Sequence, residues 1–118
     1  MNLKEQFRAI IMVIAAMMLY FTSAAASLSG RCGLSLYWSY NSSNETLTIF
    51  GKGEMSDYGD DAKEAPWEKL YLDDLHVVNV VIKDGVTSIG DSAFYRSSKL
   101  RSVSIYSSEI SIGNGAFS

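Results

Sequence analysis

The sequence has few of the residues on which small protein modules usually rely. Its 118 residues include one cysteine, one proline and one histidine, and acidic residues outnumber basic ones by 13 to 10. A lone Cys32 excludes an internal disulfide. A lone His76 cannot build a zinc site without further ligands at suitable spacing. The acidic balance argues against nucleic-acid binding, which needs a basic surface to replace phosphate counterions.

The first 26 residues have the order of a secretory signal peptide: a charged segment, an apolar run and small residues. Lys4 and Arg8 precede thirteen apolar residues, and Ala24 and Ala26 follow at positions −3 and −1 of a small-residue cleavage site. We predict export, with cleavage after Ala26 and membrane contact only during export. The chain is then secreted or at the cell surface, and residues 27–118 carry eight basic and twelve acidic residues.

Two alternatives for the amino terminus stay open. The twenty uncharged residues from Ala9 to Leu28 are just long enough for an uncleaved membrane helix. A lipoprotein anchor would need a cysteine directly after a triplet such as Leu28-Ser29-Gly30, but Arg31 stands between that triplet and Cys32.

Residues 27–76 are predicted to form a β-rich cap. Apolar residues alternate over 34–40, with Leu34 on the same face as Leu36, Trp38 and Tyr40, and again over 46–50, which predicts a hairpin. The Gly- and Asp-rich segment 51–61 is expected to be a loop. Pro66 suits the first turn of a short helix near 66–72, because the missing N–H would be unpaired there.

Residues 77–118 repeat with a period of 23. Residues 77–95 laid over 100–118 give seven identities in nineteen positions, and this period with regularly spaced apolar residues is typical of leucine-rich repeats. We predict one parallel strand per repeat, with Val80 and Ile82 stacked on Val103 and Ile105. Asp91 and Asn114 are expected to cap short helical turns. The second repeat is incomplete.

The motif S-I-G-x-x-A-F carries a family resemblance. It occurs at 88–94 and at 111–117 and resembles the BspA-type leucine-rich repeat. The preceding segments GRCGLSLYWSY, TLTIFGKGEM and APWEKL resemble the amino-terminal region of secreted bacterial proteins of this type. The resemblance covers nearly all of 30–118 and implies a mainly β solenoid that recognises host proteins or other cells. Glu109, in the place of Val86, indicates a degenerate second repeat. Ser97, where the family often has Cys, indicates no cysteine ladder.

Other candidate sites have simpler interpretations. Asp57, Asp60 and Asp61 are oxygen ligands that calcium prefers, but they lack the regular spacing of a calcium loop, so a solvated acidic loop is favoured. Gly51-Lys52-Gly53 lacks the third glycine and the helix of a dinucleotide site. The aromatic set Trp38, Tyr40, Tyr58, Trp67 and Tyr71 is predicted to cap the repeat stack rather than to bind a ligand. Asn41 and Asn44 begin glycosylation sequons in the predicted turn, which matter only in a eukaryotic secretory route.

The sequence thus predicts a non-catalytic recognition or adhesion protein, with no catalytic, cofactor or metal residue. The ligand face is expected at Asn79, Val81, Ser102 and Ser104, which point away from the inward residues of their strands. The expected ligand is a protein or a surface glycan. Alternatives are the amino-terminal module of a longer secreted hydrolase or peptidase, and an inactive fragment. The second repeat ends uncapped at Phe117-Ser118, which predicts self-association.

Overall fold

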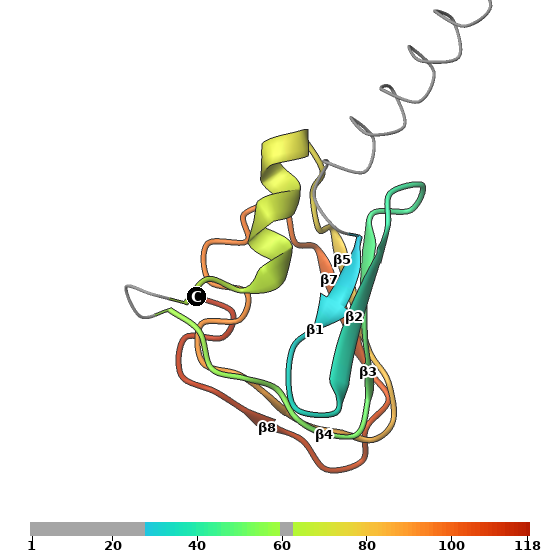
Figure 1. Cartoon of the computed structure of the whole chain (residues 1–118), viewed down its shortest axis with the longest axis vertical. Coiled ribbons are helices and arrows are strands. Elements are labelled where there is room, and N and C mark those ends of the chain that lie inside the picture. Colours follow the sequence, from blue (N-terminus) through green and yellow to red (C-terminus); the bar gives the residue numbers. More distant parts are fainter. Residues whose placement is uncertain (1–27, 60–62) are drawn as a thin grey trace, which may run out of the picture.

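The computed structural model describes residues 28–59 and 63–118, and the predicted signal peptide and its cleavage site after Ala26 lie outside them. The described chain is mainly β, as predicted (Figure 1). One sheet has five strands in the order β1 (Ser29–Arg31), β2 (Leu36–Asn41), β3 (Thr46–Gly51), β5 (Asn79–Ile82) and β7 (Ser102–Ile105). A second sheet has three: β4 (Gly53–Glu54), β6 (Val86–Ile89) and β8 (Ser111–Ile112). The 3-10 helix η1 (Pro66–Asp73) begins at the proline, as expected.

The five-stranded sheet joins an antiparallel hairpin to parallel repeat strands. β1, β2 and β3 pair antiparallel, whereas β3 pairs parallel with β5, and β5 parallel with β7. The hairpin therefore continues the same sheet that the repeats build. Alternation puts Leu36, Trp38, Leu47 and Ile49 on the inward face, where all are buried. Leu34 does not join them, because β2 begins at Leu36 and Leu34 is 93% exposed; that prediction was wrong.

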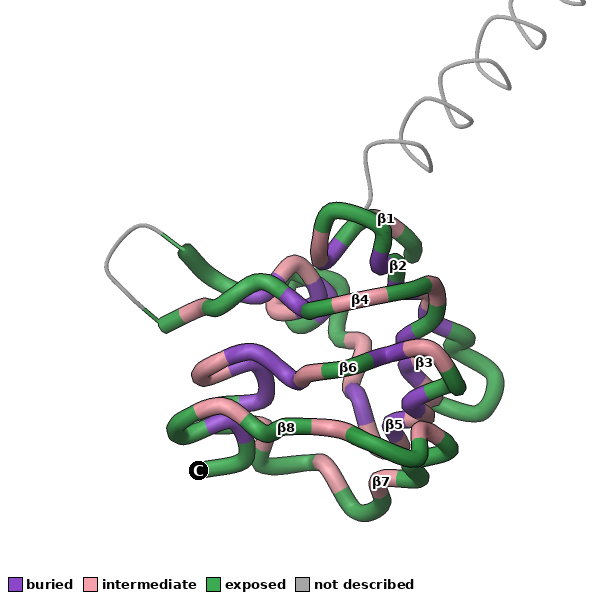
Figure 2. The backbone as a smooth tube through the Cα atoms, turned by 90° about the horizontal axis from the view of Figure 1, so that it is seen from below, coloured by how far each residue is buried: buried purple, intermediate pink, exposed green. Residues whose placement is uncertain are grey.

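The stack contains three rungs, each with one strand in each sheet. The rungs are β3–β4, β5–β6 and β7–β8, and Figure 2 shows β4, β6 and β8 running side by side in successive layers. The sequence predicted one strand per repeat and a loop over 51–61. The predicted parallel strand of each repeat is confirmed, since Val80 lies opposite Val103 and Ile82 opposite Ile105, but the predicted number of strands was wrong, because β6 and β8 add a second strand to each repeat. The predicted loop was wrong where β4 lies within it.

The degenerate start of the second repeat has a structural counterpart. β8 has two residues where β6 has four. Glu109 is exposed at the position equivalent to Val86, which is fully buried. A charged residue cannot replace a buried valine without a partner, so the strand starts later in the third rung.

A ladder of two carboxylate side chains, those of Asp57 and Asp91, connects the rungs. The Asp57 Oδ1 atom accepts a hydrogen bond from the Asp91 N–H at 2.8 Å, and the Asp91 Oδ1 atom accepts one from the Asn114 N–H at 2.7 Å. Each side chain thus binds the backbone of the next rung. Asp91 and Asn114 lie in turns rather than at the start of helical turns, so the predicted helix caps were wrong.

The backbones of successive rungs approach one another closely beside this ladder. A Cβ atom on Gly90 would overlap the carbonyl oxygen of Ser56, and one on Gly113 would collide with the backbone N of Asp91. Neither glycine has a positive φ, so the requirement is for space and not for an unusual backbone conformation. The glycine of the repeat motif is therefore needed for rung stacking.

An aromatic column fills the interior next to these turns. Phe94 stacks on Phe117 with ring centroids 5.3 Å apart, and Trp67 of η1 stacks on the other side of Phe94 at 5.1 Å. The indole N–H of Trp67 donates to the carbonyl oxygen of Ala93 at 2.9 Å. Trp67 and Trp38 are both buried. The first rung has no phenylalanine at the position equivalent to Phe94 and Phe117, and the Trp67 ring occupies that position in the column.

Among the described residues, no helix has the length and apolar character needed to cross a membrane.

We expect Gly90→Ala to destabilise the fold by about 2–3 kcal/mol, because the added methyl group forces two rungs apart in a packed interior. Urea denaturation followed by tryptophan fluorescence measures the change. Thr87→Ala, an exposed substitution in the adjoining strand β6, should stay within about 0.5 kcal/mol of the parent. Equal unfolding free energies for the two variants would contradict the close approach of the rungs.

Candidate recognition surface

The four predicted ligand-face residues form two adjacent pairs on the outward side of the five-stranded sheet. Asn79 on β5 lies opposite Ser102 on β7, and Val81 lies opposite Ser104. The Ser102 hydroxyl donates to the Asn79 Oδ1 atom at 2.7 Å. Ser102 and Ser104 are exposed, and Asn79 and Val81 are half-buried. The structure brings the four residues together, while their role in ligand binding stays a prediction.

The same face continues across the hairpin, which sequence reasoning missed. Thr46 on β3 lies opposite Asn79, and Asn41 on β2 lies opposite Thr46, so these residues form one row with Ser102. A second row continues from Ser104 and Val81 across the hairpin. It adds three hydroxyl side chains, those of Thr48, Ser39 and Ser29. The Asn79 amide also donates to the Asn44 carbonyl oxygen at 3.1 Å, which ties β5 to the hairpin turn. Short polar side chains therefore cover most of this face.

A third row, at one end of the strands, is made of cations and aromatic rings. Its members are Arg31, Tyr37, Phe50, Lys83 and Tyr106, and we name it the cation–aromatic row. Arg31 lies opposite Tyr37, which lies opposite Phe50. The backbone N–H of Lys83 bonds to Ile49 and that of Tyr106 to Ile82, which continues the same register across β5 and β7.

The side chains of this row contact one another. The rings of Tyr37 and Phe50 have centroids 5.9 Å apart and planes 31° from parallel. The Arg31 guanidinium lies 5.7 Å from the Tyr37 ring centroid, and the Lys83 ammonium lies 5.7 Å from that of Tyr106. The three rings are 38%, 40% and 65% exposed for Tyr37, Phe50 and Tyr106. Exposed aromatic side chains beside cations are the residue types that dominate binding surfaces.

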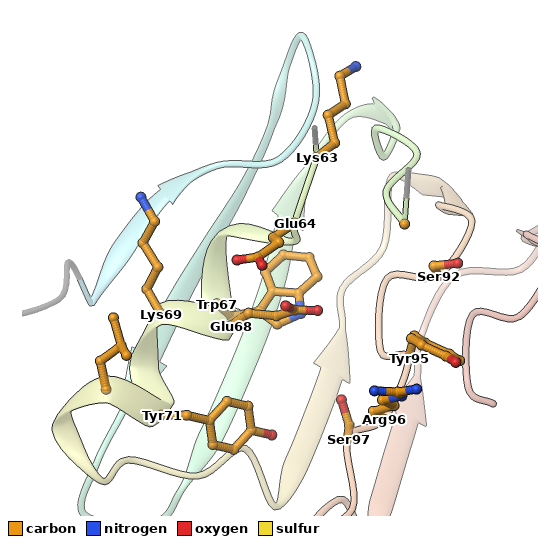
Figure 3. A pocket seen from close by; sticks show the side chains of 12 residues that line it. Lys63, Glu64, Trp67, Glu68, Lys69, Tyr71, Ser92, Tyr95, Arg96 and Ser97 are labelled. Carbon is orange, nitrogen blue, oxygen red and sulfur yellow. The ribbon is translucent and has the colours of Figure 1, made fainter. Parts of the chain in front are cut away.

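A cavity lies elsewhere, between η1 and the turn after β6. It has a volume of about 580 Å³. Figure 3 shows Glu64, Trp67 and Glu68 on one side, and Tyr95 and Arg96 on the other. Burial raises the pKa of the Glu68 carboxyl, and the neighbouring Glu64 carboxylate raises that pKa further. The cavity lining also includes Ser92 and Ser97, and among the described residues no hydrogen bond joins either hydroxyl to a carboxylate of the cavity.

The lone cysteine is part of the interior. Cys32 is 2% exposed, and burial raises the pKa of its thiol to about 12. The hydroxyl of Tyr58 donates to the Cys32 carbonyl oxygen at 3.4 Å. Since the thiolate is the reactive form of cysteine, this residue is a packing residue and not a nucleophile.

The other polar candidates are scattered. The His76 Nε2 atom lies 3.4 Å from the exposed Asp74 carboxylate, and its ring packs against Tyr71. Asp60 and Asp61 of the acidic loop lie outside the described residues, while Asp57 belongs to the ladder between rungs. Across residues 28–59 and 63–118, no three acidic, histidine or cysteine side chains are placed to hold a metal ion.

Comparison with known proteins identifies the repeats. Residues 68–118 match the family model of the BspA type leucine-rich repeat region (6 copies). The structure is similar to the crystal structure of a leucine-rich repeat protein from Eubacterium ventriosum, with 32% sequence identity and a TM-score of 0.66 over 80% of this chain. This chain spans 24% of that protein. No curated protein matches. The predicted mainly β, leucine-rich-repeat fold is confirmed.

We expect the buried thiol to make the fold sensitive to alkali. The pKa of Cys32 rises from 9.0 to about 12 on folding, so above pH 9.0 the unfolded chain loses this proton while the folded chain keeps it. Stability therefore falls as the pH rises. Between pH 9 and 10, Cys32→Ala should show a shallower loss of unfolding free energy than the parent, measured by urea denaturation.

Two features make this test specific. Burial also raises the pKa of Tyr58 from 10.0 to about 12, but this tyrosine is present in both the parent and Cys32→Ala, so the difference between their slopes reports Cys32. Ser98→Ala, at an exposed position, should keep the slope of the parent. Identical slopes for the parent and Cys32→Ala would show that Cys32 ionises equally in both states.

Proposed function

Residues 68–118 form a BspA-type leucine-rich repeat region, and from that premise we propose that the chain is an exported, non-catalytic recognition module. It acts outside the cytoplasm, secreted or at a cell surface. Its ligand is a protein or a surface glycan, and adhesion to host proteins or other cells is the role that the family resemblance implies.

The observation that carries the proposal is the outward face of the five-stranded sheet. Each strand contributes side chains to regular rows on this face, and the inward face is buried against the core. The rows are held by backbone pairing, so their spacing is set before a ligand arrives. Binding then costs little conformational entropy at the protein surface, which favours affinity.

Recognition by such a face is the sum of many weak contacts. Hydroxyl and amide groups supply hydrogen bonds, and the exposed rings of Tyr37, Phe50 and Tyr106 supply apolar contact area. Repeat stacks present extended surfaces of this kind, because each added rung places one more strand beside the last. The part of this face that the two repeats contribute lies on β5 and β7. It consists of Asn79, Val81, Ser102 and Ser104.

Export is tested first. We expect the full chain, expressed in a bacterium with a general secretion pathway, to be recovered outside the cytoplasm with Ser27 as its first residue, as shown by intact-mass spectrometry. Ala26→Leu places a large residue at the −1 position, where cleavage needs a small one, and should leave the chain uncleaved. Recovery of the chain in the membrane with Met1 intact, for both versions, would favour an uncleaved membrane helix instead.

The ligand face is tested on the exported chain. We expect the combined variant Asn79→Glu, Val81→Glu, Ser102→Glu and Ser104→Glu to lower binding to fixed epithelial cells by at least about tenfold, because it adds bulk and charge where contacts are made. Binding of the fluorescently labelled chain is measured by flow cytometry. Treatment of the cells with protease or with glycosidases, before binding, separates a protein ligand from a glycan.

The matched control adds the same charge elsewhere. Thr87, Ser98, Ser108 and Ser118 are exposed and away from the face, so their four glutamate substitutions together should leave binding unchanged. Because like charges on paired strands lower stability, unfolding midpoints are compared, and the diagonal pair Val81→Glu and Ser102→Glu replaces the fourfold variant if that one unfolds. Equal binding by the ligand-face variant and the control variant would show that Asn79, Val81, Ser102 and Ser104 do not contact the ligand.

A further inference from the structure

We propose that the cation–aromatic row is a docking surface for an acidic polypeptide segment that carries apolar or aromatic side chains between its carboxylates. The inference rests on the proposed function and narrows it, since it names the chemistry of the partner and the part of the face that binds it.

Charge is the first argument. Residues 27–118 carry eight basic and twelve acidic residues, yet the outward positions of β1, β2, β3, β5 and β7 include no carboxylate. The outward residues of these strands are serine, threonine, asparagine, valine, aromatic residues and Arg31, and the second cation, Lys83, directly follows β5. Glu45 and Asp84, next to these strands in sequence, lie in the turns at their ends, and Asp84 accepts a hydrogen bond from the Gly85 N–H. The row itself therefore contains two cations and no carboxylate, and the nearest acidic residue in sequence is Asp84, which directly follows Lys83.

Apolar area is the second argument. Tyr37 and Phe50 are both exposed although they pack against one another. A hollow of about 490 Å³ adjoins them at the outer edge of the sheet, lined in part by Arg31, Tyr37 and Phe50. Aromatic anchors beside a recess are the usual centres of protein-binding surfaces. The partner therefore needs an apolar or aromatic side chain to fill the recess, besides its carboxylates.

The placement of the cations favours a polypeptide over a sugar chain. A sugar ring stacks on the open face of an aromatic ring, but Arg31 already lies over Tyr37, and Lys83 lies over Tyr106. The rings of Tyr37 and Phe50 pack against one another, with centroids 5.9 Å apart and planes 31° from parallel. A cation held over a ring keeps N–H groups free to bind carboxylates, and a guanidinium binds a carboxylate with two hydrogen bonds.

Length is the last argument. The row crosses five strands whose separation is about 4.8 Å, so it extends for about 19 Å. A small anion would occupy only one end of it. An extended peptide of about six residues covers the distance, which allows carboxylates to reach both Arg31 and Lys83 while an apolar side chain lies between them at Phe50.

The test uses the exported chain and synthetic polymers as probes. Biolayer interferometry measures its binding to an immobilised random copolymer of glutamate and tyrosine, to polyglutamate, to a copolymer of lysine and tyrosine, and to heparin. We expect the glutamate–tyrosine copolymer to bind most tightly, and its binding to weaken as salt is added, because salt screens exposed charge pairs.

Two double variants separate charge from apolar contact. Arg31→Gln with Lys83→Gln should weaken binding of the glutamate–tyrosine copolymer by about fivefold to tenfold, the size expected for two exposed ion pairs. Tyr37→Ser with Phe50→Ser should weaken it by at least about tenfold. The matched controls are Lys69→Gln with Lys99→Gln, and Tyr71→Ser with Tyr95→Ser. These are exposed residues off the row, and both control variants should bind as the parent does.

The outcomes distinguish this inference from the function on which it rests. Tighter binding to heparin than to any polypeptide, or equal loss in the row and control variants, would overturn the acidic-peptide assignment. If the row variants still bind epithelial cells like the parent while the glutamate substitutions at Asn79, Val81, Ser102 and Ser104 do not, the row is not the docking surface, and the proposed function stands. If the parent binds neither cells nor any polymer, the proposed function fails and the inference fails with it.

Discussion

The close approach of successive backbones beside Gly90 and Gly113 is the constraint on which the stack depends. A side chain at either position would separate the rungs, and the hydrogen bonds from Asp57 to Asp91 and from Asp91 to Asn114 would be lost with that separation. These bonds set the position of each turn on the one before. Because the turns are in register, the strands leading into them are in register too, and their outward side chains fall into rows.

The same constraint explains the role of the short helix. Each complete rung places a phenylalanine beside its glycine, and Phe94 and Phe117 stack in consequence. The first rung has the ladder residue Asp57 but no phenylalanine at the position equivalent to Phe94 and Phe117, which would leave one side of Phe94 uncovered. Helix η1 supplies Trp67 at that place, and its indole N–H satisfies the Ala93 carbonyl oxygen. The cap is therefore built to complete the column of the repeats.

The sequence was sufficient for the fold class and for the two repeats, because the identities between 77–95 and 100–118 include both the inward apolar residues and the glycines. It did not reveal the first rung. A register shift between Gly53 and Glu54 breaks the alignment of β4 with β6, and Met55-Ser56 retains neither the Ile nor the Gly of the motif. The prediction of helix caps at Asp91 and Asn114 was wrong for a different reason. The side chain of Asp91 binds a residue 23 positions away, whereas capping rules consider only the residue's own turn.

The candidate surface was predictable only where it lies on the repeats. Alternation places Asn79, Val81, Ser102 and Ser104 outward in any strand of that register, and the structure has them paired. Arg31, Tyr37 and Phe50 could not be added, because nothing in the sequence states that the hairpin joins the repeat strands in one sheet. That junction is the parallel pairing of β3 with β5, and it puts residues from Arg31 to Tyr106 in a single row. The surface is thus a product of the junction between cap and repeats, and neither part alone carries it.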